Sequence, residues 1–285
     1  MGLVSSKTLL EEAYAHKYAV GGFGIPTFEF AEAVIAAATE TRTPVIVNIP
    51  EGQFTEKGFE NICHAVIDLI ERQDIPIGIH LDHGKNFNSA QKAIKFGINS
   101  VLIDYSEESF EKNVRLTKRV VEYAHAHNTT VEGELGRMSG GDGLTAPAKA
   151  DEKGFTDPAQ VEEFLEKTGV DFLSVSVGTV HGKYSETPRI DYNRLEMINE
   201  KAEIPLIFHG GSGTPCDMLQ KAIAHGIAKI HIYNDMLQAA TESVRAELAV
   251  SPDRLIVPDI LQDAMTRVKE VVEGKIICFS KNVSA

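Results

Sequence analysis

Three segments of the sequence each place a histidine beside a glycine at the end of an apolar run. They read His80-Leu81-Asp82-His83-Gly84, Val180-His181-Gly182-Lys183 and Phe208-His209-Gly210-Gly211-Ser212-Gly213. A single histidine at such a position is more often a structural hydrogen-bonding residue than a ligand. Three neutral imidazoles with an open fourth position make a catalytic zinc-type site, whose cation polarises a substrate carbonyl as a Lewis acid. His83, His181 and His209 are therefore predicted to bind a metal.

Carboxylates fall at the same ends of the apolar runs. Asp104 follows the run 100–103, and Glu134 lies near the end of the run 130–135. Asp82 directly precedes His83, and neighbouring residues of a strand point to opposite faces. A turn at this point must bring both side chains inward if they act together.

Glycines gather around the same positions, at Gly182 and on both sides of Ser212. Glycine lets the backbone approach a ligand closely. N–H-rich turns where a strand meets a helix bind phosphate, especially on the later strands of a barrel. A lone segment of this composition is often a plain loop, but beside a candidate metal ligand it predicts a phosphate-binding turn.

Eight short runs, most of them rich in Val and Ile with little alternation, must hold these residues in place. Such runs are typical of strands buried on both faces, as in parallel sheets. Amphipathic stretches lie between most of them, which favours a (β/α)8 barrel, one domain over residues 1–285, against a doubly wound open sheet. The predicted strands are Tyr18–Phe23, Pro44–Ile49, Ile75–Leu81, Ser100–Asp104, Thr130–Leu135, Phe172–Val177, Pro205–Phe208 and Lys229–Ile232. The predicted helices include Phe28–Glu40, Glu56–Arg72, Glu108–His127, Pro158–Thr168, Pro215–His225 and an extra C-terminal helix over Ile260–Val272.

One long segment, Gly136–Thr156, interrupts the alternation of strands and helices. It contains five glycines and many small or charged residues, without an apolar period. Loops of this length are uncommon inside compact domains and are often lids. The alternative is a disordered surface insertion.

The composition limits the function classes. The net charge of −13 argues against nucleic acid as a partner, because phosphate-backbone binding needs a basic face. No window approaches the roughly 18 apolar residues of a membrane span, and the first residues lack a signal-peptide pattern. Cys63, Cys216 and Cys278 show no CxxC spacing and do not indicate a disulfide framework. We therefore expect a reducing, cytoplasmic location.

Together, four motifs resemble the signatures of the class II ketose-bisphosphate aldolases, the family of fructose- and tagatose-bisphosphate aldolases. They occur in order over nearly the whole chain and read His80-Leu81-Asp82-His83-Gly84, Glu132-Gly133-Glu134-Leu135-Gly136, His181-Gly182-Lys183 and His209-Gly210-Gly211-Ser212-Gly213. The resemblance implies reversible retro-aldol cleavage of a ketose (bis)phosphate or related sugar acid phosphate into a dihydroxyacetone-phosphate-like ketone and an aldehyde. It also implies Zn²⁺ or another divalent transition metal, allows a monovalent cation, and suggests a homodimer or homotetramer.

By position, the resemblance assigns His83, His181 and His209 as metal ligands. Asp82 matches the residue that passes a proton to or from the C4 hydroxyl while the cation stabilises the enediolate. Two acidic residues match positions that help seat the metal or host an alternative site, namely Asp104 and Glu134. The residues that match the phosphate cradle are Gly182, Lys183, Gly210, Gly211 and Ser212.

The sequence departs from the family pattern where the substrate is expected. The family contacts the ketose and its phosphate with Asn and Thr or Ser at the last strand end, which here carries His231, Tyr233 and Asn234. Asp142 stands where a glutamate of the family enolises the ketone. In two further segments Phe23-Gly24 replaces Phe-Asn, and Asp104-Tyr105-Ser106 replaces Asp-Gly-Ser.

These departures favour the same chemistry on another substrate, and the cradle could hold an anion other than phosphate. Two alternatives stay open. The chain could be an ordinary fructose- or tagatose-1,6-bisphosphate aldolase whose substrate contacts have drifted. It could also be a non-catalytic barrel that binds metal or sugar phosphate as an accessory subunit. An assay for metal-dependent retro-aldol cleavage separates the last hypothesis from the two enzymes.

Overall fold

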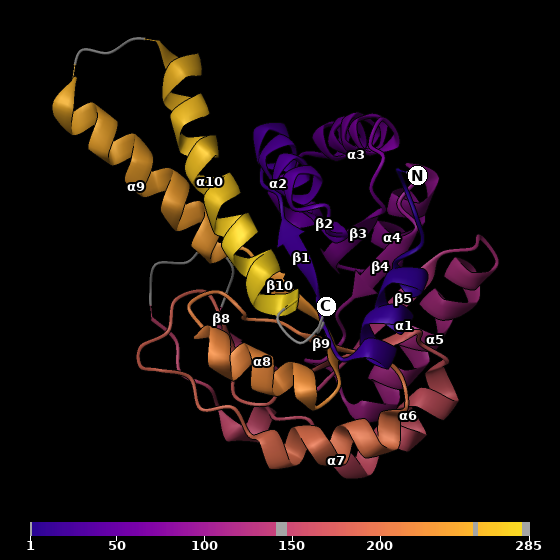
Figure 1. The fold of residues 1–285 in the computed structure, drawn as a ribbon. Helices are drawn as coiled ribbons and strands as arrows, with labels where there is room; N and C mark the ends of the chain where they lie inside the picture. The colour runs from indigo at the N-terminus through magenta and orange to yellow at the C-terminus, as the bar shows by residue number, and fades with distance from the viewer. Residues whose placement is uncertain (1, 141–146, 253–255, 281–285) are drawn as a thin grey trace.

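A closed barrel of eight parallel strands forms the centre of the computed structural model, which describes residues 2–140, 147–252 and 256–280 (Figure 1). Its strands are β1 (Val20–Gly24), β2 (Val45–Pro50), β3 (Ile77–Gly84), β4 (Ser100–Ile103), β5 (Thr130–Leu135), β7 (Phe172–Val175), β9 (Leu206–Phe208) and β10 (Ile227–Ile232). They follow one another around the barrel in chain order, and β10 closes it by pairing with β1. The predicted (β/α)8 barrel is confirmed, and every strand overlaps a predicted run.

Helices surround this barrel and α1 covers one end of it. The surrounding helices are α2 (Phe28–Thr41), α3 (Glu56–Glu71), α4 (Phe87–Lys95), α5 (Phe110–His125), α6 (Val161–Thr168), α7 (Tyr192–Ala202) and α8 (Cys216–Ala224). Leu9 and Leu10 of α1 (Ser6–His16) pack against residues near the N-terminal ends of the strands, such as Val20 and Ile46. The opposite end, where the strands terminate, is left for the site. Among the described residues, no helix is both long and apolar enough to cross a membrane.

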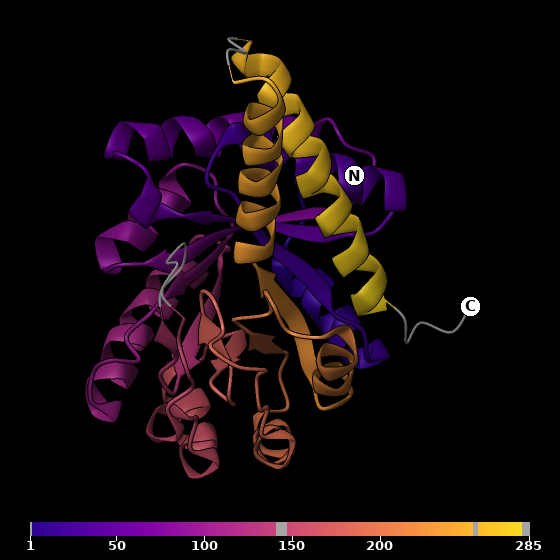
Figure 2. The ribbon, with the colours of Figure 1, turned by 90° about the vertical axis from the view of Figure 1, so that its left-hand side faces the viewer.

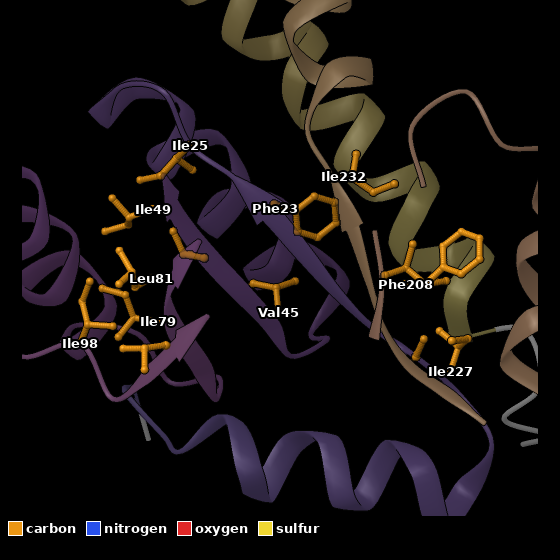
Figure 3. Close-up of a cluster of buried hydrophobic side chains, with 14 of the residues drawn as sticks. Phe23, Ile25, Val45, Ile49, Ile79, Leu81, Ile98, Phe208, Ile227 and Ile232 are labelled. Atoms are coloured by element: carbon orange, nitrogen blue, oxygen red, sulfur yellow. The ribbon is translucent and has the colours of Figure 1, made fainter. Parts of the chain in front are cut away.

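Alternation within the strands separates the core from the barrel interior. In β2 and β3, apolar residues such as Val47 and Ile79 belong to the main hydrophobic core, part of which Figure 3 shows. The residues between them, Asn48 and His80, pair across the two strands and are also buried. Because side chains of a strand alternate between its faces, these polar residues point into the barrel.

The segment Gly136–Thr156 is anchored at both ends. Its strand β6 (Ser139–Gly140) pairs with β8 (Val180–His181), and the backbone N–H of Arg137 donates to Gly154 O at 2.6 Å. Asp142 lies outside the described residues. The predicted closure of this segment over a substrate therefore stays a prediction.

Two C-terminal helices project beyond the barrel (Figure 2). Helix α9 (Asn234–Val250) begins directly after β10, and α10 (Val257–Ser280) packs along α9, α2 and α8. The predicted helix over Ile260–Val272 lies inside α10, whereas α9 was not predicted. Its only described buried residue is Met236, so the apolar signal of this helix is weak.

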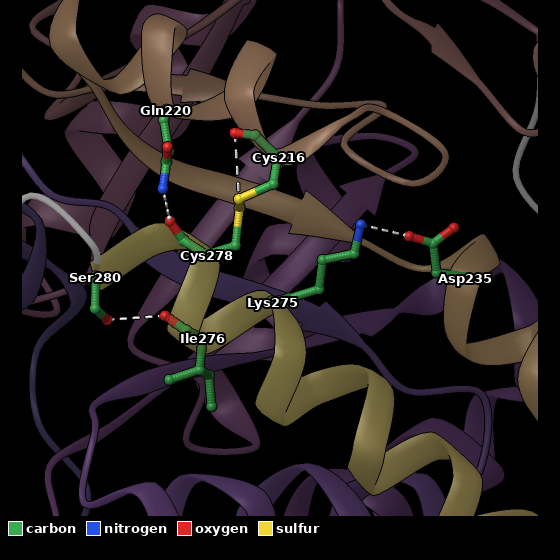
Figure 4. Close-up of a disulfide and its surroundings, with 7 residues drawn as sticks. All are labelled: Cys216, Gln220, Asp235, Lys275, Ile276, Cys278 and Ser280. Carbon is green, nitrogen blue, oxygen red and sulfur yellow. Dashed lines mark hydrogen bonds and ion pairs between the residues drawn. A yellow bond between two sulfur atoms is a disulfide. The ribbon is translucent and has the colours of Figure 1, made fainter.

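A disulfide joins Cys216, at the start of α8, to Cys278 near the end of α10 (Figure 4). The sequence analysis did not expect this bond, because 61 intervening residues give no sign that the two cysteines meet. The fold brings them together by returning α10 along the barrel. Cys63 is buried and unpaired, and burial raises the pKa of its thiol to about 12, which keeps it protonated and unreactive.

We expect reduction of this disulfide to lower the free energy of unfolding by about 4 kcal/mol, since it closes a loop with a sequence separation of 62 residues. Cys216 and Cys278 line an open surface groove, which a small phosphine reductant can enter. Urea unfolding with and without reductant measures the difference. A Cys63→Ser variant is the matched control and should show the same difference. Equal unfolding free energies in both conditions would show that the bond does not stabilise the fold.

Candidate active site

Three histidines converge where the strands end. His83 lies at the end of β3, His181 in β8 and His209 directly after β9. One ring nitrogen of each histidine lies within 4.8 Å of a ring nitrogen of the other two. The ring centroid of His83 is 4.9 Å from that of His181 and 4.9 Å from that of His209. The structure thus brings together the three predicted ligands, each from a different segment of the chain.

The backbone at His83 explains how this residue and Asp82 reach the same site. His83 has φ 45°, a left-handed conformation that costs energy for a residue other than glycine. The pairing of β3 with β4 also shifts register between Leu81 and Gly84. This irregularity interrupts the alternation of the strand. An oxygen of Asp82 and a nitrogen of His83 each lie within 4.8 Å of a nitrogen of His209.

His209 is oriented by a buried carboxylate. Its Nε2 donates to Glu132 Oε1 at 2.9 Å, while its Nδ1 is buried without a hydrogen-bond partner among the described residues. A carboxylate that holds one nitrogen of a histidine leaves the other as the lone-pair donor that a cation needs. Burial and the charges of neighbouring histidines lower the pKa of His209 well below its ordinary value. The side chain is therefore neutral, as a metal ligand must be.

Glu132 also forms a buried ion pair across the barrel. Lys229 Nζ lies 2.8 Å from Glu132 Oε2, and both side chains are at most 1% exposed. Burial opposes ionisation of Glu132, but Lys229 and His80 outweigh it and lower the pKa of the carboxyl. Gly22 leaves space for the lysine, because a Cβ there would lie 2.8 Å from Lys229 Cε. The pair fixes Glu132, and through it His209.

A second acidic group flanks His83. Asp104 Oδ2 lies 3.8 Å from His83 Nδ1, and Glu134 completes a cluster of three potential ligands. Burial raises the pKa of Asp104, but the nearby imidazole of His83 and hydrogen bonding from Ser106 together lower it well below its ordinary value. Burial, with the charge of Asp104, raises the pKa of Glu134 well above its own. These opposite shifts favour the ionised form of Asp104 and the protonated form of Glu134.

The glycine-rich turn after β9 lies against a neighbouring loop. Gly210 has φ 72°, and a Cβ there would clash with the carbonyl oxygen of Val180. The hydroxyl of Tyr184 donates to Gly210 O at 2.7 Å. Ser212 Oγ accepts from the backbone N–H groups of Tyr233 at 3.1 Å and Asp235 at 3.2 Å. Within the part of the chain that the structure describes, no acceptor takes the hydroxyl proton of Ser212, so the proton can be donated to an anion.

The far side of this turn is connected to the C-terminal helix. Asp235 Oδ1 accepts from the backbone N–H of Gly213 at 2.9 Å, and its Oδ2 lies 2.7 Å from Lys275 Nζ of α10 (Figure 4). The other predicted cradle residues, Gly182 and Lys183, follow β8, and the Lys183 side chain is exposed. The predicted phosphate-binding turn is thus held in place by α9 and α10.

Two departures from the family pattern compensate each other. Tyr233 is 4% exposed and its ring covers Gly24, where a Cβ would lie 2.6 Å from Tyr233 Cδ2. The Tyr233 hydroxyl is hydrogen-bonded to the amide of Gln53. An asparagine at position 24 would therefore exclude this tyrosine. Asn234, the other altered position, is the first residue of α9.

Sequence reasoning gave no role to several residues that build the site. Glu132 and Lys229 are charged residues within buried strands, and Asn48 is a polar residue in another. Such residues are rarely fully buried without a partner. Their occurrence within strand-like runs could therefore have indicated that they pair with one another inside the barrel. Tyr184 lies in a loop and carried no comparable signal.

Comparisons with known proteins agree over the whole chain. The family model described as fructose-bisphosphate aldolase class-II matches residues 4–283. The fructose-bisphosphate aldolase of Geobacillus stearothermophilus is 38% identical over 294 aligned residues, which cover 100% of this chain and 99% of that protein. The probable fructose-bisphosphate aldolase of Bacillus subtilis is 37% identical over the full length of both. The crystal structure of the YdjI aldolase from Escherichia coli K12 superposes with a TM-score of 0.86, at 31% identity over 99% of this chain and 98% of that one.

Proposed function

Because the chain belongs to the class II fructose-bisphosphate aldolase family and is a lyase of carbohydrate metabolism, we propose that it cleaves a ketose phosphate with a divalent cation held by His83, His181 and His209. The observation that carries this proposal is the convergence of the three imidazoles, one of them neutral with a buried nitrogen that lacks a partner. Three nitrogen donors suit Zn²⁺ and several other transition metals.

The chain's own residues account for the remaining chemistry. The bound cation supplies the positive charge that stabilises an enediolate. Asp82 moves the proton at the C4 hydroxyl, which lies beside the C3–C4 bond that breaks or forms. The N–H-rich turn with Ser212 binds the phosphate of the ketone half and fixes its orientation. Glu132 and Lys229 hold His209, so that the donor set is preorganised before substrate arrives.

The same geometry supports a substrate other than fructose 1,6-bisphosphate. Tyr233, packed on Gly24 and bonded to Gln53, is a larger and more rigid wall than small polar residues provide. Asn234 offers an amide where the family offers a hydroxyl. A site built around one set of polar groups strongly rejects analogues that do not match it.

We expect fructose 1,6-bisphosphate to be cleaved poorly relative to another ketose phosphate. A screen of ketose mono- and bisphosphates with metal-loaded protein, identifying both products, gives the ratio of kcat/KM values. Asn234→Thr, alone and with His231→Asn, should shift this ratio toward the bisphosphate. If the native protein cleaves fructose 1,6-bisphosphate as efficiently as its best substrate, the departures from the family pattern do not change specificity. If no ketose phosphate is cleaved, the proposed function is wrong.

A further inference from the structure

His231 is enclosed inside the barrel, next to the proton carrier. It lies in β10 and is 2% exposed. Its Nδ1 is 2.6 Å from the side-chain nitrogen of Asn48 in β2. An amide nitrogen can only donate a hydrogen bond, so Nδ1 accepts it. The neutral ring therefore carries its proton on Nε2.

That Nε2 faces Asp82. It lies 3.6 Å from Asp82 Oδ2, and both side chains are 2% exposed. The distance is longer than a hydrogen bond, as catalytic contacts commonly are before substrate binds. The other oxygen, Asp82 Oδ1, is buried and has no hydrogen-bond partner among the described residues. One carboxylate oxygen thus has a neighbouring donor, and the other is left for a hydroxyl of the substrate.

The histidine ring is held on its face as well as at Nδ1. It stacks on His209, with ring centroids 5.0 Å apart and planes 8° apart. Gly22 permits the arrangement, because a Cβ there would lie 3.1 Å from the Asn48 amide nitrogen. An asparagine at position 231 has a single amide group on a shorter side chain. It cannot contact Asn48 and Asp82 at the same time.

We propose that His231, fixed by Asn48, is a positioning residue for Asp82 in carbon–carbon bond cleavage. This role rests on the proposed function. The Nε2–H holds Oδ2, and this orients Oδ1 toward the substrate hydroxyl. In the cleavage direction the hydroxyl proton passes to Oδ1 as the C3–C4 bond breaks. The bond electrons stay with the ketone half, and the hydroxyl carbon becomes the aldehyde. No oxidant or further reactant is required.

A double-mutant cycle on metal-loaded protein tests this role. His231→Asn should lower kcat by about 10- to 100-fold, the scale of a misplaced catalytic group, and change KM much less. In an Asp82→Asn background the same substitution should change kcat by less than about twofold, because its target is gone. His80→Asn is the matched control, since His80 is also a buried histidine but contacts Ser100 and Glu132. Its effect should persist in full in the Asp82→Asn background.

Proton exchange separates positioning from general damage. Exchange of dihydroxyacetone phosphate in D₂O needs the enolising machinery but no carbon–carbon cleavage. His231→Asn should retain this exchange within about threefold and bind the cation at wild-type stoichiometry, and His231→Gln should recover part of kcat by its longer reach. ¹⁵N NMR of metal-loaded protein should show the proton of His231 on Nε2, and Asn48→Ala should abolish that preference.

The outcomes distinguish two failures. If His231→Asn lowers the residual kcat of Asp82→Asn by the same factor as it lowers the native kcat, His231 does not act through Asp82. The same conclusion follows if His231→Asn reduces proton exchange and metal content as much as it reduces cleavage. A proton found on Nδ1 overturns the proposal in the same way. If instead Asp82→Asn cleaves at the native rate, Asp82 is not the proton carrier and His231 has nothing to position. Failure of the native protein to cleave any ketose phosphate would show that the proposed function itself is wrong.

Discussion

Replacing His209 by alanine should remove the bound cation and nearly all retro-aldol activity, while the barrel stays folded. His209 contributes one of three nitrogen donors, and the remaining two form an incomplete site. The lost cation takes with it the charge that stabilises the enediolate, which is commonly worth several kcal/mol in the transition state. Metal analysis, cleavage assays and circular dichroism measure the three quantities separately.

His83→Ala tests the same site without disturbing the core. His209 is buried against Glu132, whereas the side chain of His83 is 25% exposed. Removing the His83 side chain therefore takes no partner away from a buried charge. A chelator should reproduce both substitutions, and added Zn²⁺ should restore the chelated native protein only. His127→Ala is the control, because His127 is an exposed histidine between the end of α5 and the start of β5, at the opposite end of the barrel from the site. If a His209 or His83 variant binds stoichiometric metal and keeps full turnover, the replaced histidine is not a metal ligand.

The barrel was readable from the sequence because its strands are buried on both faces. Runs such as 44–49 and 205–208 are apolar enough to exclude a surface position, and short enough to exclude a helix. The helices α1, α4 and α7 were not named among the predicted ones, although each buries several residues. Helix α9 buries so little that no periodic signal exists.

The three converging histidines could be predicted as candidate ligands because residue type and position limit the choice strongly. Few side chains other than histidine supply a neutral nitrogen donor, and barrels place their sites at strand ends. The contact between Asp82 and its neighbours was not readable. It depends on the left-handed backbone of His83 and on the register shift of β3, which are properties of three-dimensional pairing.

His231 shows the same limit in another way. The sequence placed it at the strand end that contacts substrate in the family, and that contact stays a prediction. The structure adds Asn48 and Asp82 as its neighbours, and these come from strands on the other side of β1. The partners of a buried polar residue in a closed barrel are set by closure, which brings together residues more than a hundred positions apart. The Cys216–Cys278 bond depends on the return of α10 for the same reason.

Asp82→Asn should keep the cation and lose carbon–carbon cleavage by a factor of about 10²–10⁴, the scale of a lost acid–base group. The amide has nearly the shape of the carboxylate, so the fold and the three imidazoles are preserved. It cannot accept the hydroxyl proton, because its oxygen is far less basic than a carboxylate. Cleavage of the best ketose phosphate, with metal content measured on the same sample, gives the two quantities.

The control for Asp82→Asn is the exchange reaction of the ketone half. Enolisation of dihydroxyacetone phosphate needs the cation and the phosphate cradle, but no proton at C4, so it should continue at near the native rate. Asp104 provides a second comparison, since its Oδ2 lies 3.8 Å from His83 Nδ1 and its pKa is lowered by His83 and Ser106 despite burial. Asp104→Asn should weaken metal retention, whereas Asp82→Asn should not. Native cleavage by Asp82→Asn would assign the proton to another group, and loss of exchange together with cleavage would make Asp82 a residue that supports the metal site.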